Sequence, residues 1–238
     1  MEPAPLFPHL PDSPLPHIHR LLLAHYGRPT PREPWDPLTQ FIYSLLSSST
    51  KTPDSHQVML DLRARFGTWE NLRDAPLEDI ERAIQIVTFP EAKAPWLKAA
   101  LLQITARCGS LSLDFLAKYR TEKIRAWLEA FEGIGPKTSA AVVNFSTLRR
   151  RALCIDSHHL RVTQRLALTP RADAAITEQR LMRLVPDSWD AAMLDEHHTL
   201  IELHGQTLCT FADPNCKSCP LLALCPFGKK RAAGSLAH

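Results

Sequence analysis

The chain has 238 residues, a length that suits one large domain or two small ones. Hydrophobic residues make up 45 %, enough for a buried core, which argues against a disordered chain. The net charge of +3 is too small by itself to indicate nucleic acid, and no apolar run of about 18 residues predicts a membrane span. No basic region precedes an apolar one at the N-terminus, so we expect a cytoplasmic protein whose six cysteines are not in disulfides.

The first third of the chain alternates proline-rich segments with short helical patterns. Residues 1–16 predict an extended, poorly ordered arm, and residues 17–26 a short helix that ends at Gly27. A second proline cluster over residues 29–37 indicates a linker. Apolar residues at helical spacing then predict a helix over residues 37–48.

The rest of the chain also predicts helices. Asp54 is the expected N-cap of a helix that runs to Phe66 and stops at Gly67. Only eight glycines and no convincing alternating pattern argue against a hairpin-rich fold, so we predict an all-α class. Further helices are predicted over residues 77–86, 92–107, 121–131, 157–168, 175–185 and 191–209.

The positive charge is concentrated in one stretch, from Lys118 to Arg165. It holds ten lysines and arginines against four acids, a net of +6, which leaves −3 for the rest of the chain. A basic segment on a nearly neutral protein is typical of a phosphate-binding face, although a solvated helix surface would look the same.

A glycine turn inside this stretch carries the first functional signal. Gly133 and Gly135 can adopt positive φ, and Pro136 suits the first turn of a new helix. The amides at the start of that helix would bind an anion, assisted by the helix dipole. We therefore predict a helix–hairpin–helix motif that holds a DNA phosphate without reading sequence.

Two ionisable residues near this turn suggest chemistry. Lys137 lies in the first turn of the predicted helix, where the dipole and any burial favour its neutral, nucleophilic form. Asp156 begins another helix, where it either caps the helix or offers a carboxylate to positive charge developing on a sugar.

Four cysteines near the C-terminus, in the spacing C-x6-C-x2-C-x5-C, suggest a metal site: Cys209, Cys216, Cys219 and Cys225. Zinc sites with four cysteines usually show two Cys-x2-Cys pairs, which this pattern lacks, so a [4Fe–4S] cluster is the favoured cofactor. Lys217 lies inside this loop and could contact phosphate.

These motifs together resemble the endonuclease III family of helix–hairpin–helix DNA glycosylases. The similarity rests on residues 133–138, on residues 155–162, and on the cysteine loop with its lead-in at residues 203–205. The resemblance implies that Lys137 attacks C1′ of a damaged nucleotide, forms a Schiff base and cuts the strand by β-elimination, with Asp156 assisting. Gly133, Gly135 and Thr138 would bind the phosphate.

Two positions depart from the family pattern. The family usually has a glutamine where this chain has Ser49, and serine is too short to fill the space left by a flipped nucleotide. Phe89 occupies the second gap-filling position, where it could wedge between bases or simply belong to the core. We therefore expect altered lesion processing, or a preference for abasic or single-stranded DNA.

The expected architecture is a helical barrel over residues 30–150 beside a cluster domain formed by residues 1–29 and 151–238, with the active cleft between them. We expect a nucleoid-associated monomer that binds damaged double-stranded DNA and no membrane. Two alternatives remain: a DNA-binding protein that has lost efficient catalysis, and a glycosylase without lyase activity.

Overall fold

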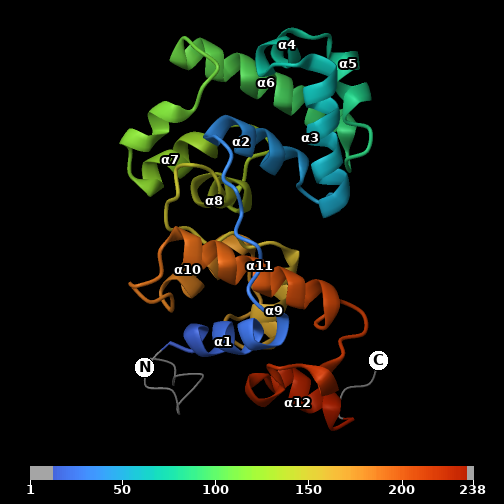
Figure 1. Ribbon diagram of the computed structural model, residues 1–238, viewed down its shortest axis with the longest axis vertical. Helices are drawn as coiled ribbons and strands as arrows, with labels where there is room; N and C mark the ends of the chain where they lie inside the picture. Colours follow the sequence, from blue (N-terminus) through green and yellow to red (C-terminus); the bar gives the residue numbers. More distant parts are fainter. Residues whose placement is uncertain (1–12, 235–238) are drawn as a thin grey trace. The chain divides into compact units, whose positions relative to one another are not determined.

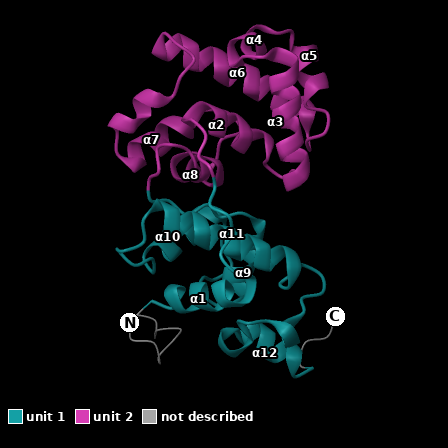
Figure 2. Cartoon of the chain, in the orientation of Figure 1, with its two compact units in different colours: residues 1–32, 151–238 teal, residues 33–150 magenta. Residues whose placement is uncertain are grey.

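All regular elements of the protein are helices in residues 13–234, which the computed structural model describes (Figure 1). The predicted all-α class is therefore confirmed. The chain divides into two compact units, one of residues 33–150 and one that joins residues 1–32 to residues 151–238 (Figure 2). The N-terminal segment thus folds with the C-terminal third of the chain.

The unit of residues 33–150 is built around one buried helix. Every residue of α8 (Pro136–Phe145) from Thr138 onward is buried. Helix α2 packs along α8, and the Phe41 ring of α2 meets the Phe131 ring edge-on at 5.7 Å between centroids. The other elements of this unit are α2 (Pro37–Leu46), α3 (Thr52–Phe66), α4 (Trp69–Asp74), α5 (Leu77–Ala83), α6 (Pro90–Cys108), the 3-10 helix η1 (Asp114–Lys118) and α7 (Thr121–Leu128).

The second unit places helix α1 (Leu15–Tyr26) against the long helix α11 (Ala191–Thr207). The Tyr26 hydroxyl lies 3.0 Å from both His204 Nδ1 and Thr207 Oγ1, and His19 Nε2 lies 3.1 Å from a Glu196 carboxylate oxygen. These polar contacts fix α1 on a face that also buries apolar side chains. The remaining elements are α9 (Ser157–Arg165), α10 (Ala174–Met182), η2 (Cys216–Ser218), η3 (Leu222–Leu224) and α12 (Pro226–Ala232).

Several predicted boundaries were wrong. Asp54 is not the N-cap of α3, because the helix already begins at Thr52 after Lys51, and Asp54 lies in its first turn. Gly67 does end that helix, with a φ of 72°. Helix α1 begins at Leu15, inside the segment predicted to be an extended arm; residues 1–12 of that arm lie outside the described residues.

Short helices and helix ends account for the other differences. Helices α4 and α12 were not predicted, because six or seven residues give too little periodicity to recognise. Helix α2 ends at Leu46 rather than residue 48, and α7 ends at Leu128 rather than residue 131. The residues by which these predictions were too long, 47–48 and 129–131, belong to the turns that follow each helix.

Candidate functional site

The glycine turn joins α7 to α8, as the motif predicted. Gly133 has a φ of +80°, and a Cβ atom there would lie 2.6 Å from Cε3 of Trp96. Glycine is required at this position for both backbone conformation and space. Gly135 does not adopt the positive φ expected of it: its φ is −106°, it serves as the extended N-cap residue of α8, and a Cβ atom there would meet no atom within 4 Å.

The start of α8 presents Lys137 and Thr138. Lys137 is half-buried in the first turn and Thr138 is buried, and no described side chain caps this helix end. Ser139 is held from α7, because its hydroxyl accepts from Arg125 Nε at 3.0 Å and donates to the Glu129 carboxylate. Arg125 and Glu129 therefore fix the first turns of α8 through Ser139. The amides at the start of α8 keep the arrangement expected of an anion site.

Ser49 and Phe89, the two expected gap-filling residues, lie on neighbouring loops of this unit. Both have a left-handed backbone, with φ of 57° and 59°, which is uncommon for residues other than glycine. The Thr88 hydroxyl donates to the Ser49 carbonyl oxygen at 2.9 Å, and the Thr88 amide donates to Thr50 Oγ1 at 3.1 Å. Phe89 is 60 % exposed, so it is not the core aromatic that the sequence left as an alternative.

Lys93 fixes the Ser49 loop through hydrogen bonds, a role that no sequence pattern indicated. Its side chain is 3 % exposed, and its ammonium donates to the carbonyl oxygens of Leu46 and Ser48 at 2.7 and 2.6 Å and to Thr50 Oγ1 at 3.1 Å. Burial, together with the nearby charge of Lys137, lowers the pKa of Lys93 to about 8. A lone lysine in an amphipathic helix gives no signal of this kind, because its partners are backbone atoms of a distant loop.

Asp156 lies in the other unit and caps α9. Its Oδ1 accepts from the His159 amide at 2.6 Å, so the predicted capping role is confirmed. Burial by itself raises the pKa of this carboxyl, but the charge of His198 and the hydrogen bond from His159 outweigh it, and the net pKa is lowered. Asp156 therefore stays ionised at neutral pH. Lys137 and Asp156 belong to different units.

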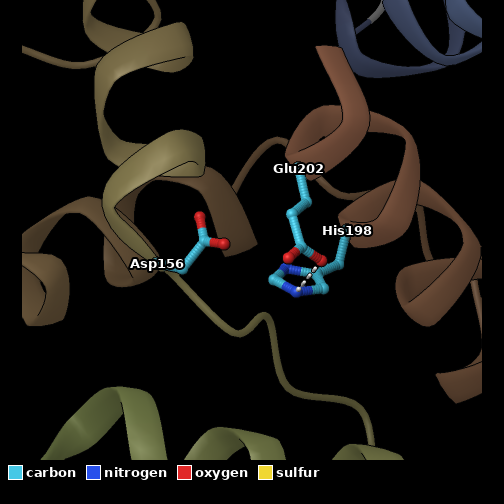
Figure 3. A group of neighbouring side chains, drawn as sticks. All are labelled: Asp156, His198 and Glu202. Carbon is cyan, nitrogen blue, oxygen red and sulfur yellow. Dashed lines mark ion pairs between the residues drawn. The ribbon is translucent and has the colours of Figure 1, made fainter. Parts of the chain in front are cut away.

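Figure 3 shows the side chains of His198 and Glu202, both from α11, next to the side chain of Asp156. His198 is buried, and its Nδ1 lies 2.9 Å from the Cys154 carbonyl oxygen. Its Nε2 lies 3.8 Å from Glu202 Oε2. One ligand atom of this histidine lies within 4.8 Å of carboxylate oxygens of both Asp156 and Glu202.

The four cysteines line one pocket with Arg165, His204 and apolar side chains. Arg165 Nη1 donates to Cys209 Sγ at 3.3 Å and to the Thr210 carbonyl oxygen at 2.7 Å, and the Gly228 amide donates to Cys225 Sγ at 3.2 Å. Burial is the main cause that raises the pKa of Cys219 to about 11, and the neighbouring thiolates add to it. Lys217 is exposed at the surface of this loop, in η2.

This pocket fits an iron–sulfur cluster better than a single zinc ion. A tetrahedral zinc ion with Zn–S bonds of about 2.3 Å holds its sulfurs roughly 3.8 Å apart. Within residues 13–234, no three cysteine sulfurs lie within 4.8 Å of one another, which is wider than that zinc spacing. N–H donors to sulfur, an arginine and apolar walls are the surroundings expected of a cluster.

Some arginines of the basic stretch, residues 118–165, are less available to DNA phosphates than their charge suggested, because they form hydrogen bonds within the protein. Arg161 Nε and Nη2 donate to the carbonyl oxygens of Cys209 and Gly205 at 2.9 and 2.8 Å. Arg150 Nη2 donates to the Ala117 carbonyl oxygen at 2.7 Å. Several of the counted charges therefore fix loops within the protein.

No helix in the described part of the chain is long and apolar enough to cross a membrane.

Comparison with known proteins finds endonuclease III among the similar proteins. No protein-family model matches the chain. The endonuclease III of Escherichia coli strain K12 is 35 % identical over 106 residues, which are 44 % of this chain and 48 % of that protein. The endonuclease III of Haemophilus influenzae is 33 % identical over 119 residues, 49 % of this chain and 54 % of that protein. The chain is thus similar to endonuclease III over just under half of its length.

Solved structures of endonuclease III share the fold of this chain. The non-covalent endonuclease III–DNA complex has a TM-score of 0.74 and 23 % identity, and the match covers 92 % of this chain and 97 % of that one. At this identity the likeness establishes the helix–hairpin–helix glycosylase fold and no more. The chain spans about half the length of the curated relatives it matches.

Proposed function

We propose that this protein is a DNA glycosylase of base-excision repair with abasic-site lyase activity, acting on oxidised pyrimidines or abasic sites. One observation carries the proposal: Lys137 lies in the first turn of α8, directly after a turn whose Gly133 only glycine can occupy. A helix start of this kind binds phosphate through its amides and dipole. It would hold a DNA backbone against an amine that can act as a nucleophile.

In this mechanism the Lys137 amine attacks C1′ of the damaged nucleotide, and the base leaves with its bonding electron pair. The nitrogen then loses a proton and the C1′–O4′ bond breaks, which opens the sugar ring and leaves a Schiff base at C1′. Loss of a proton at C2′ drives β-elimination, in which the bond from C3′ to the phosphate oxygen breaks and the phosphate leaves. The ionised Asp156 carboxylate stabilises positive charge on the sugar, supported by its lowered pKa. Gly135 and Thr138 bind the phosphate with the amides at the start of α8.

We further propose that Cys209, Cys216, Cys219 and Cys225 hold a [4Fe–4S] cluster. When bound, such a group cross-links its loop and adds stability. Arg161 and Arg165 tie this loop to α9, and the exposed Lys217 would contact a DNA phosphate. The proposed protein is a monomer in the cytoplasm, associated with the nucleoid.

Borohydride trapping tests the nucleophile. Reduction in the presence of DNA with an abasic site converts a Schiff base into a stable adduct, which gel electrophoresis detects. We expect an adduct with the wild type and with Lys123→Ala, an exposed lysine of the same unit. Lys137→Ala should give none. DNA binding without any wild-type adduct would instead support a glycosylase without lyase activity or a binding protein.

Ser49 favours a second candidate substrate, abasic or single-stranded DNA. Extruding a base from a duplex costs a few kcal/mol of unstacking, and a serine side chain offsets little of it. A substrate without a stacked partner avoids that cost. Glycosylase assays on thymine glycol in duplex and single-stranded oligonucleotides test this: higher activity on the single strand is expected, and equal or better activity on the duplex contradicts it.

A further inference from the structure

Three potential metal ligands converge in the unit of residues 151–238. One ligand atom from each of Asp156, His198 and Glu202 lies within 4.8 Å of the others (Figure 3). His198 and Glu202 are four residues apart on α11 and so share a helix face. Helix α9, which Asp156 caps, packs against α11. The geometry therefore comes from two packed helices rather than from a mobile loop.

The histidine is oriented as a metal ligand would be. Nδ1–H donates to the Cys154 carbonyl oxygen at 2.9 Å, so Nε2 is the ring nitrogen that would bind an ion, with loss of its proton. That nitrogen faces Glu202, whose Oε2 lies 3.8 Å away. Histidines that bind metals almost always hold their second ring nitrogen in this way, because it fixes the tautomer and the ring.

A second, independent observation lies beside these ligands. The His159 ring is 0 % exposed and stacks on the His198 ring, with centroids 5.8 Å apart and an interplanar angle of 20°. Neither of its ring nitrogens has a hydrogen-bond partner among the described residues. A buried polar group without a hydrogen bond is energetically unfavourable, and a bound ion with its water is a common partner for such a group.

We propose that Asp156, His198 and Glu202 form a binding site for a divalent cation that accepts oxygen and nitrogen ligands, such as Mn²⁺. Two carboxylates supply negative charge and one imidazole supplies nitrogen, a set that suits this class of ion. The Glu202 side chain is 26 % exposed, which gives an ion access from solvent. The amide of His159 already fixes one Asp156 oxygen, so the other is left for the ion.

The site has a consequence for the reaction, which rests on the proposed function. Asp156 is the carboxylate assigned to stabilising the sugar cation. A divalent cation on that carboxylate competes with the developing positive charge and repels it. Occupancy of the site therefore inhibits base removal, while the hairpin in the other unit keeps its phosphate-binding amides.

Binding is tested on the full-length, cluster-loaded protein with Mn²⁺, which thiolates bind poorly. Electron paramagnetic resonance measures free Mn²⁺ by its six-line signal. We expect one Mn²⁺ per wild-type chain, affinity lower by about tenfold or more in Glu202→Gln, and wild-type affinity in Glu122→Gln, an exposed acid of the other unit. Circular dichroism and melting of each variant check its folding. The site is refuted if the wild type binds no stoichiometric Mn²⁺ or if Glu202→Gln binds it equally well.

Inhibition is measured separately, as the base-removal rate with Mn²⁺ divided by the metal-free rate of the same variant. This ratio should fall for the wild type and stay near one for Glu202→Gln. Binding without inhibition overturns the inhibitory role and leaves the site standing. A wild type with no metal-free activity overturns the proposed function and the inhibitory role together, and the binding result is unaffected.

Discussion

The ammonium of Lys93 donates to the Ser48 carbonyl oxygen, with 2.6 Å between Nζ and O. The same group holds Leu46 and Thr50, so one buried charge fixes the loop that carries Ser49. Strained left-handed residues persist only where their surroundings hold them. Lys93 supplies that restraint, and it does so from α6, the helix that Phe89 begins.

The lowered pKa of Lys93 predicts a pH-dependent stability. Its pKa is about 8 in the folded protein against 10.5 for an ordinary lysine. Between these pH values the unfolded chain binds more protons than the folded one, so the free energy of unfolding contributed by Lys93 rises with pH. Urea unfolding at several pH values should show a steeper rise over this range for the wild type than for Lys93→Met. Parallel curves would contradict the assignment.

The two glycines of the hairpin should respond differently to alanine. Gly133→Ala introduces a Cβ 2.6 Å from Trp96 and a left-handed alanine, and should destabilise the protein by about 2 kcal/mol or more. Gly135→Ala meets no atom within 4 Å at a negative φ, and should cost less than about 1 kcal/mol. Thermal unfolding compares the two. Equal losses of stability would mean that the hairpin does not depend on the close approach to Trp96.

Capping and chemistry can be separated at Asp156. Asp156→Ala removes the acceptor for the His159 amide and should destabilise the protein by about 1 kcal/mol. Asp156→Asn keeps an acceptor and should stay within about 0.5 kcal/mol of the wild type. Both variants lack the carboxylate, so both should lose base-removal activity. Full activity in the asparagine variant, measured beside its denaturation curve, would show that Asp156 is only a cap.

Arg165 should control how well the cysteine loop retains its cluster. It donates to Cys209 Sγ and to the carbonyl oxygens of Thr210 and Phe211, so Arg165→Met releases one side of the loop. We expect faster loss of visible absorption and of bound iron under a chelator. Arg180→Met, an exposed arginine of α10, is the matched control and should bleach at the wild-type rate. Equal rates in both variants would remove Arg165 from this role.

Phe89 should contribute to DNA affinity through stacking. An exposed aromatic ring on a restrained loop gains about 1–3 kcal/mol by stacking on one base. Phe89→Ala should therefore weaken binding to an abasic-site duplex by about tenfold, measured by fluorescence anisotropy. Leu60→Ala removes an equally exposed apolar side chain of the same unit and should have little effect. Similar losses in both would indicate non-specific apolar contact instead.

The local sequence was sufficient for the longer helices, the hairpin and the cysteine loop, but not for the short helices α4 and α12. Helical spacing of apolar residues, the pair of Gly133 and Pro136, and the spacing from Cys209 to Cys225 are local patterns, and each determines structure over one or two turns. Asp156 could be recognised as a cap for the same reason. These features need no knowledge of which distant segments meet, and they are the ones that the structure bears out.

Only the tertiary structure decided which residues serve the site together. Lys93 acts on a loop more than 40 residues away, and the partners of Arg165 lie equally far along the chain. His198 and Glu202 reach Asp156 because α9 and α11 pack together. Packing between distant segments depends on how the whole apolar surface is buried, and no spacing in the sequence records it.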